Sequence, residues 1–327
     1  MIDIPTAVSN TFRRAGVRAR AVGDVVEALA VRTVHVDADP LDIVAAARMR
    51  RALCTALGSR HVILQDADDG GLSVMVPQPQ RRALTIPQLW RIAPPVGLAV
   101  PVGLDIHMQP VVWDIARVPH GYAGGLTGSG KSWLVRTIIA GLAVGNAPGA
   151  LRIVPIDPKG QTWIDPLCRL AHLDHAPATN APDGNAALAR VKAEIQARIA
   201  GTSPRIPMVV IVDEANMLDA DLLRFVVDYG RELAVYALYT SRVLSKESGM
   251  PREVWSQLPA RFCGAVAAGD HYTSKMALGN ARLATHLLGR GDMYACMDDV
   301  LTRFQAAGCH PEASFWRASG WAGRVTA

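Results

Sequence analysis

The chain has 327 residues, of which 50% are hydrophobic and 19% are charged. These values exclude a disordered or fibrous protein and allow a large buried core. The net charge of +5 permits an anionic partner such as nucleic acid without requiring one. The most apolar stretch free of charge, residues 92–104, is interrupted by prolines and is too short to span a bilayer. Because the amino terminus also lacks the apolar core of a secretion signal, we expect a cytoplasmic protein with no membrane segment of its own.

Residues 31–101 have the pattern of a small α+β subdomain. Apolar residues alternate over residues 31–36, as in a strand, and recur at helical spacing over residues 41–57. The first 30 residues show little pattern and are predicted to form a separate N-terminal segment. Two further strands and a proline-rich crossing segment are predicted at residues 62–64, 72–76 and 77–101.

Residues 102–310 alternate short apolar runs with amphipathic helices, and residues 311–327 are predicted to form a C-terminal tail. The alternation is typical of an α/β fold in which helices cover both faces of a mainly parallel sheet. The predicted strands are residues 151–156, 208–212, 234–239, 262–267 and 293–296. The predicted helices are residues 132–145, 186–200 and 220–233.

The clearest motif is Gly125-Leu-Thr-Gly-Ser-Gly-Lys-Ser132, which matches the phosphate-binding loop G-x-x-x-x-G-K-[ST]. Its glycines allow positive φ angles and a close approach of backbone N–H groups to a phosphate. Lys131 is predicted to reach the terminal phosphates of ATP, and Ser132 to offer a hydroxyl ligand to Mg²⁺. The alternative is a glycine-rich turn that only caps a helix. The predicted ATP-binding residues are Gly125, Thr127, Gly128, Ser129, Gly130, Lys131, Ser132 and Trp133.

An acidic pair, Asp213-Glu214, follows the strand predicted at residues 208–212. At the carboxyl end of a strand beside the phosphate-binding loop, Asp213 can support Mg²⁺, and Glu214 can polarise the water that attacks the γ-phosphate. A glutamate at this position favours hydrolysis over nucleotide binding alone. The alternative is a pair of surface carboxylates that caps the next helix.

A third predicted strand, residues 234–239, is followed by Thr240-Ser241-Arg242. Ligands of open α/β folds bind at the carboxyl ends of the strands. Ser241 and Arg242 are therefore candidates for sensing the γ-phosphate. The alternative is a strand whose exit simply becomes polar.

Several segments, in their order along the chain, resemble the motor of the FtsK/SpoIIIE family of DNA translocases. Residues 103–120 are similar to the stretch before the family's phosphate-binding loop, and Ile156-Asp-Pro-Lys-Gly160 is similar to one of its strand ends. Leu258-Pro-Ala-Arg-Phe262 and Leu287-Leu-Gly-Arg-Gly-Asp-Met293 resemble later motifs that general NTPases lack. The resemblance extends over residues 30–310.

The resemblance implies a RecA-like P-loop NTPase core and a homo-hexameric ring that encloses double-stranded DNA and moves along it by ATP hydrolysis. It assigns catalysis to Lys131 and Glu214, and metal binding to Ser132 and Asp213. Arg261 falls where the family has an arginine finger directed at the ATP of the neighbouring subunit, although an ordinary surface arginine is the alternative. Lys275 aligns with a basic residue that contacts the DNA backbone in the family.

The chain departs from the family at Ser241, where the family usually has a glutamine. We also expect it to lack the family's N-terminal membrane domain and C-terminal winged-helix module. The leading hypothesis is an ATP-driven translocase on double-stranded DNA. A related alternative is a genome-packaging or conjugative-transfer ATPase of a mobile element, docked on a capsid or membrane partner. An alternative of another class, kept open by Ser241, is a nucleotide-dependent switch or scaffold with slow hydrolysis.

Overall fold

The computed structural model describes residues 2–59, 61–67, 70–163, 165, 167–242 and 252–308. The predicted tail, residues 311–327, lies outside this described part. The described residues form two compact units. The first comprises the residues up to Ala83 together with Asp105–Gln109, and the second comprises Leu84–Leu104 together with the described residues from Pro110 on.

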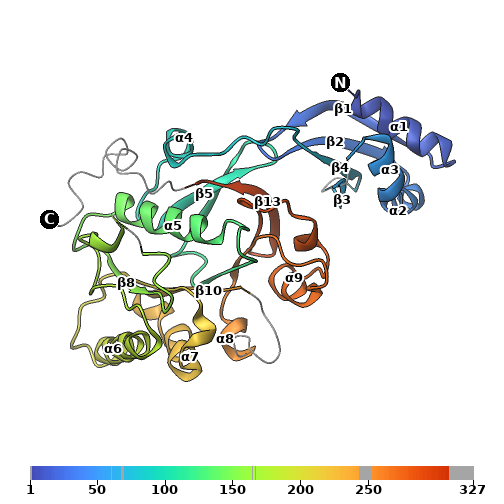
Figure 1. Cartoon of the computed structure of the whole chain (residues 1–327). Helices are drawn as coiled ribbons and strands as arrows, with labels where there is room; N and C mark the ends of the chain where they lie inside the picture. Colours follow the sequence, from blue (N-terminus) through green and yellow to red (C-terminus); the bar gives the residue numbers. More distant parts are fainter. Residues whose placement is uncertain are drawn as a thin grey trace. The chain divides into compact units, whose positions relative to one another are not determined.

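The first unit is an antiparallel sheet packed against helices (Figure 1). Its core contains Val8 and Phe12 from the first helix, Leu53 from the third, and Val34 and Val74 from the sheet, all of them fully buried. The helices are α1 (Ile4–Arg14), α2 (Pro40–Ala47) and α3 (Arg50–Ala56), and the strands are β1 (Ala19–Glu27), β2 (Val31–Ala38), β3 (Ile63–Asp66) and β4 (Leu72–Pro77). In the described residues these strands form a four-stranded sheet in the order β1-β2-β4-β3.

This unit differs from its predicted boundaries in two places. The first 30 residues do not form a separate segment, because α1 and β1 belong to the core of the unit. Residues 84–104 belong to the second unit, because β5 (Ala99–Asp105) is part of the second sheet. Within the unit, the helix predicted over residues 41–57 is divided into α2 and α3.

The second unit is built on a nine-stranded sheet in the described part of the chain. Besides β5, its strands are β6 (Pro110–Asp114), β7 (Gly121–Gly124), β8 (Arg152–Ile156), β9 (Met208–Val212), β10 (Val235–Ser241), β11 (Ala260–Cys263), β12 (Asp292–Met297) and β13 (Val300–Ala306). Their order is β6-β5-β13-β12-β11-β7-β10-β9-β8. The run β11-β7-β10-β9-β8 is parallel, whereas the pairs β11–β12, β12–β13 and β5–β6 are antiparallel. The predicted α/β fold with a mainly parallel sheet is confirmed.

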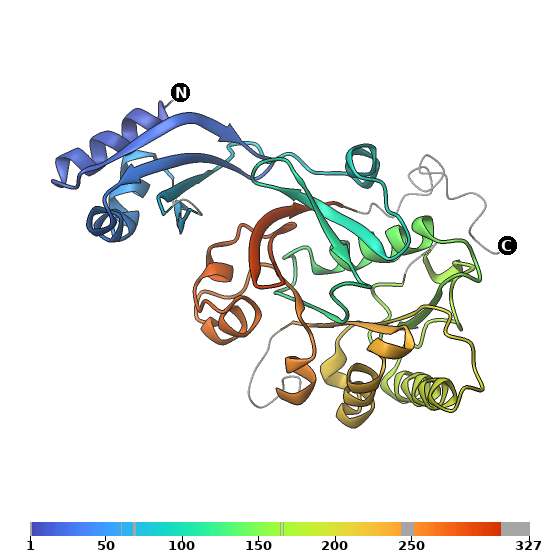
Figure 2. The ribbon, with the colours of Figure 1, turned by 180° about the vertical axis from the view of Figure 1, so that it is seen from behind.

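Helices cover both faces of the parallel run. Figures 1 and 2 show α5 on one side of the sheet and α6 and α7 on the other. All residues of β9 are buried, and Met208, Val210 and Val212 share a core with α6 and α7. Since successive side chains in a strand point to opposite faces, Val209 and Ile211 face the α5 side. The helices of this unit are α4 (Ile86–Ile92), α5 (Lys131–Gly145), α6 (Ala181–Ile199), α7 (Ala220–Tyr229), α8 (Arg252–Ser256) and α9 (His271–Leu278), with short 3₁₀ turns at Leu167–Arg169, Ala215–Met217, Arg231–Leu233 and Leu283–His286.

The parallel arrangement brings several loops to one edge of the sheet. The carboxyl ends of β7, β8, β9 and β10 lie at the same edge because these neighbouring strands run in one direction. The loops that follow them are those in which the sequence predicts phosphate binding, metal binding and sensing. None of the helices in the described residues has the length and apolarity needed to cross a bilayer.

Candidate nucleotide-binding site

The phosphate-binding loop connects β7 to α5. The four residues of β7 are buried, and α5 begins at Lys131. Between them, Gly125, Gly128 and Gly130 have φ angles of 141°, 82° and 107°, which non-glycine residues rarely adopt. A Cβ at Gly128 would meet no atom within 4 Å, so this part of the loop faces open space. The backbone therefore has the conformation that the motif predicts.

The loop borders a cavity of about 560 Å³. Among the described residues, its lining includes five cationic side chains and two acidic ones, a balance that suits a polyanionic ligand accompanied by a metal ion. The lining residues are Gly125, Leu126, Thr127, Gly128, Gly130, Lys131, Ser132, Trp133, Arg136, Lys159, Gln161, Asp213, Glu214, Arg242 and Arg290. Apart from Ser129, every predicted ATP-binding residue lies at this cavity.

The acidic pair at the end of β9 lies beside the loop lysine. Lys131 Nζ is 3.8 Å from Asp213 Oδ1 and 3.7 Å from Glu214 Oε1. All three side chains are less than 10% exposed. The fold thus brings together, at one buried point of the cavity, two motifs that are far apart in the sequence.

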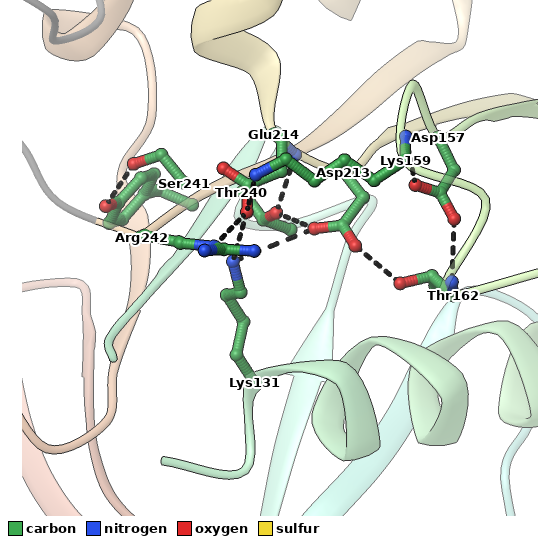
Figure 3. Close-up of polar contacts among 10 residues, drawn as sticks. Lys131, Asp157, Lys159, Thr162, Asp213, Glu214, Thr240, Ser241 and Arg242 are labelled. Atoms are coloured by element: carbon green, nitrogen blue, oxygen red, sulfur yellow. Dashed lines mark hydrogen bonds and ion pairs between the residues drawn. The ribbon is translucent and has the colours of Figure 1, made fainter. Parts of the chain in front are cut away.

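Asp213 is held by two hydroxyl groups, one from the loop after β8 and one from β10 (Figure 3). Thr162 Oγ1 donates to Asp213 Oδ2 at 2.5 Å, and Thr240 Oγ1 donates to Asp213 Oδ1. Thr162 lies in the loop after β8, which is anchored by the buried Asp157. That carboxylate accepts hydrogen bonds from the backbone N–H of Thr162 at 2.6 Å and of Lys159 at 3.1 Å. Both carboxylate oxygens of Asp213 therefore have a fixed orientation.

Glu214 has a different environment, composed of cations. Its Oε1 atom is 2.9 Å from Arg242 Nε and 3.1 Å from Lys159 Nζ, in addition to its contact with Lys131. The backbone of Glu214 is left-handed, with φ of 53°, and its N–H donates to Thr240 Oγ1 at 3.2 Å. This conformation turns the chain sharply after β9, so that the two adjacent carboxylates share Lys131 but otherwise have different partners.

The two sensor candidates lie in different places. Arg242 lines the cavity and pairs with Glu214, whereas Ser241 is buried and does not line it. The hydroxyl of Ser241 is 2.8 Å from that of Tyr122 in β7. Burial raises the pKa of the Tyr122 hydroxyl above its ordinary value, so this group stays protonated. The structure therefore places Arg242, but not Ser241, where a side chain can contact a ligand in the cavity.

Arg261 and Lys275 do not line this cavity. Arg261, in β11, donates from Nε to the carbonyl oxygen of Leu258 at 3.0 Å, and its guanidinium lies 5.0 Å from the ring centre of Trp255. Lys275 is exposed on α9. Neither side chain contacts the other predicted site residues, so the roles of both stay predictions.

Sequence reasoning missed several residues that the structure places at the site. Lys159 lies within the quoted segment Ile156–Gly160, and Thr240 directly precedes a sensor candidate, so a signal was present for both. Arg290 likewise lies in the family-like segment Leu287–Met293, although no role was predicted for it. Thr162 reaches the site from a loop whose position depends on the tertiary fold. For Thr162, no motif indicated a contact with Asp213.

The strand-loop-helix unit, the acidic pair at the end of a neighbouring parallel strand and the cavity between them define a P-loop ATPase. Solved structures have the same fold. The pCW3 conjugation coupling protein TcpA is 14% identical, with a TM-score of 0.62 over 94% of this chain and 95% of that one. The cytoplasmic domain of the type VII secretion ATPase EccC of Thermomonospora curvata is 26% identical, with a TM-score of 0.58 over 73% of this chain and 32% of that one.

Sequence comparison finds similarity to one family of proteins. The FtsK/SpoIIIE family model matches residues 87–203. The DNA translocase SftA of Bacillus subtilis is 38% identical over 101 residues, which are 31% of this chain and 10% of SftA. The DNA translocase FtsK of Lactiplantibacillus plantarum is 26% identical over 232 residues, covering 61% of this chain and 29% of FtsK. The similarity to this family thus covers the phosphate-binding loop, residues 125–132. It spans about a third or less of the length of the curated relatives it matches.

Proposed function

We propose that this chain is an ATP-driven translocase that acts on double-stranded DNA as a homo-hexameric ring. The observation that carries the proposal is the meeting of Lys131, Asp213 and Glu214 at one buried point of a cationic cavity. The names of its relatives SftA and FtsK, both DNA translocases, support DNA as the substrate. We also propose a cytoplasmic location, where ATP and DNA are both present.

The cavity residues suit ATP and Mg²⁺. Because the loop faces open space at Gly128, a phosphate bound in the cavity can approach the loop backbone closely. Lys131 supplies a positive charge at the same cavity. Ser132 lies in the first turn of α5 and lines the same cavity as Asp213, so a hydroxyl and a carboxylate oxygen are both available to Mg²⁺. When bound, Mg²⁺ neutralises charge that develops on the phosphates.

The hydrogen bonds around Asp213 are consistent with a role as a metal-supporting residue. Thr162 and Thr240 each donate one hydroxyl hydrogen to it, which fixes the carboxylate plane and leaves further lone pairs for the metal or its water ligands. Partners that orient a metal ligand in this way contribute to affinity. Asp157 supports Asp213 indirectly, because it accepts a hydrogen bond from the backbone of the loop that carries Thr162.

Glu214 is proposed as the residue that activates water. A carboxylate at this position can orient water for attack on the γ-phosphate and accept its proton. Arg242 and Lys159, which contact the same carboxylate oxygen, then link the loops after β8 and β10 to the state of this glutamate. Arg242 is thereby the better supported of the two sensor candidates.

Two further roles rest on the family pattern. Arg261 is proposed to reach the ATP of a neighbouring subunit in the ring, where a guanidinium would stabilise transition-state charge. In the single chain it lies on Trp255, outside the cavity that its own subunit would use. Lys275, exposed on α9, is proposed to contact the DNA backbone.

ATP turnover with and without linear duplex DNA tests the proposal. We expect DNA to stimulate turnover at low salt and the stimulation to fall as salt rises, because contacts to backbone phosphates release counterions. Electron microscopy of the same sample with an ATP analogue should show six-fold particles threaded by DNA. ATP turnover that is unchanged by DNA at every salt concentration would contradict the translocase and favour a nucleotide-dependent switch.

A second candidate function is that of an ATPase in protein secretion. It is favoured by the similarity to the ESX secretion system protein EccC of T. curvata, which is 43% identical over 79 residues, or 22% of this chain and 6% of EccC. Turnover that responds to a secretion substrate peptide and not to DNA would favour this candidate over the translocase.

A further inference from the structure

Residue 290 is an arginine in a backbone conformation that favours glycine. Gly289, Arg290 and Gly291 have φ angles of 69°, 52° and 87°, all in the left-handed region. A side chain in this region costs folding free energy that a glycine would avoid. Such a residue persists where its surroundings enforce the conformation, often at a functional site. The side chain of Arg290 therefore calls for a functional explanation.

The segment Gly289–Gly291 is attached to the phosphate-binding loop. The backbone N–H of Arg290 donates to the carbonyl oxygen of Gly128 at 2.9 Å, and that of Gly291 donates to the carbonyl oxygen of Ser129 at 2.8 Å. At Gly130 the two segments approach so closely that a Cβ would collide with the backbone of Gly291. Residue 290 thus has a fixed position beside the loop.

A buried ion pair braces this segment from the sheet side. Arg303 in β13 donates from Nε to Asp292 Oδ1 at 3.0 Å and from Nη2 to Asp292 Oδ2 at 2.8 Å. Asp292 Oδ2 also accepts the backbone N–H of Leu288 at 2.8 Å, and Gln305 Nε2 donates to the carbonyl oxygen of Arg290 at 2.9 Å. The backbone on both sides of Arg290 is therefore held independently of the arginine side chain.

Arg290 lines the same cavity as Lys131 and Arg242. The residue is exposed, and within the described residues its side chain forms no ion pair or hydrogen bond. Arg242, by contrast, is paired with Glu214. A planar guanidinium with several donors matches the geometry of phosphate oxygens.

We infer that Arg290 is a phosphate-binding residue, which contacts the phosphates of the nucleotide held by residues 125–132. The inference rests on the proposed nucleotide-binding function. It adds to that site one positively charged side chain, which comes from the segment before β12 in the antiparallel part of the sheet. The phosphate-binding loop thereby receives a ligand contact from a segment more than 150 residues further along the chain.

The substitution Arg290→Gly tests this inference without disturbing the backbone, because glycine adopts the left-handed conformation freely. We expect the affinity for a slowly hydrolysed ATP analogue, measured by calorimetry, to fall about tenfold, as for loss of one charge-assisted hydrogen bond. Arg290→Lys, which keeps the charge, should recover part of the affinity. The matched control is Arg282→Ala, which removes an exposed arginine that does not line the cavity and should leave affinity unchanged.

Two further titrations separate the possible outcomes. Tripolyphosphate, which lacks base and ribose, should compete less well in Arg290→Gly than in the unaltered protein. If only ATP binding weakened and tripolyphosphate binding did not, contact with the phosphates would be excluded. If Lys131→Ala weakened ATP binding and Arg290→Gly did not, the inference alone would fail. If neither variant weakened binding, the nucleotide site itself would be misplaced.

Discussion

The two ends of the parallel strands have opposite character. At the carboxyl ends of β7, β9 and β10 lie a cavity, the phosphate-binding loop and the charged side chains around Asp213 and Glu214. At the amino end of β7, His120 is buried and accepts a hydrogen bond from the backbone N–H of Ala237 in β10 at 3.1 Å. The carboxyl end presents charged side chains to a cavity. At the amino end, a buried histidine joins two central strands by a hydrogen bond.

This difference suggests a division of roles. Ligands of open α/β folds bind at the carboxyl ends of the strands, where the loops can vary without disturbing the sheet. A buried polar group at the opposite end contributes through the hydrogen bond it forms. Substitutions at the carboxyl end should therefore change ATP turnover more than stability, and those at the amino end should do the reverse.

The largest effect is expected for Glu214→Gln. Loss of the carboxylate that activates water should lower ATP turnover by about 10²–10⁴-fold while ATP still binds, because Lys131 and the loop are unchanged. Glutamine can still accept hydrogen bonds from Arg242 and Lys159, but it removes the negative charge beside three cations, so the free energy of unfolding should fall by about 1–3 kcal/mol. Turnover and ATP affinity are measured on the same preparation. The control Glu253→Gln alters an exposed glutamate that does not line the cavity, and normal turnover in Glu214→Gln would disprove the assigned role.

The next effect concerns the dependence of stability on pH through His120. Burial, with a further contribution from Arg231, lowers the pKa of His120 from 6.5 to about 4, although Asp228 and Glu232 line the same hollow. Between these two values the unfolded chain binds the additional proton and the folded chain does not. The titration of His120 therefore lowers the free energy of unfolding by about 3 kcal/mol as the pH falls from 6.5 to about 4.

The substitution His120→Asn measures this contribution. Asparagine tolerates the left-handed φ of 59° at this position and can accept the same backbone hydrogen bond, but it does not titrate. The difference in unfolding free energy between the two proteins should change by about 3 kcal/mol between pH 7 and pH 4. ATP turnover at pH 7.5 should stay unchanged. A parallel pH dependence in both proteins would show that His120 is not responsible.

The sequence predicted the residues that lie in local motifs and missed those that depend on the tertiary fold. Gly125–Ser132 and Asp213-Glu214 are recognisable because each motif needs its residue types at adjacent positions. Arg290 lies in the family-like segment Leu287–Met293, but that resemblance assigned it no role, and its place at the cavity depends on the backbone hydrogen bonds of Gly289–Gly291 to the loop. Ser241 shows the converse, since a residue in the predicted segment faces Tyr122 instead of the cavity.

The fold was predictable to a similar extent. The strand predicted at residues 208–212 coincides with β9, because an unbroken apolar run is typical of a strand buried on both faces. The helix α1 was missed although Ile4, Val8 and Phe12 recur every four residues on its buried side. The division between α2 and α3 has no glycine or proline to mark it, so the sequence offered no signal for that break.

The smallest effect is expected for Thr162→Val, which tests whether the hydroxyl on Asp213 matters for metal binding. Valine keeps the shape and the backbone N–H that bonds to Asp157, but one oxygen of Asp213 loses its donor. Thr162 is a cleaner choice than Thr240, whose hydroxyl also accepts the N–H of Glu214. The Mg²⁺ concentration for half-maximal turnover should rise about tenfold, as for loss of a group that orients a metal ligand.

The matched control for this prediction is Thr137→Val. Thr137 is also fully buried, and its hydroxyl donates to the carbonyl oxygen of Ala307 at 3.0 Å, away from the carboxylates. Both substitutions should lower the free energy of unfolding by about 1 kcal/mol, because each leaves a buried acceptor without its donor. A shift in the Mg²⁺ requirement in Thr162→Val alone would assign the effect to Asp213. An equal shift in both variants would trace it to general destabilisation and remove Thr162 from the site.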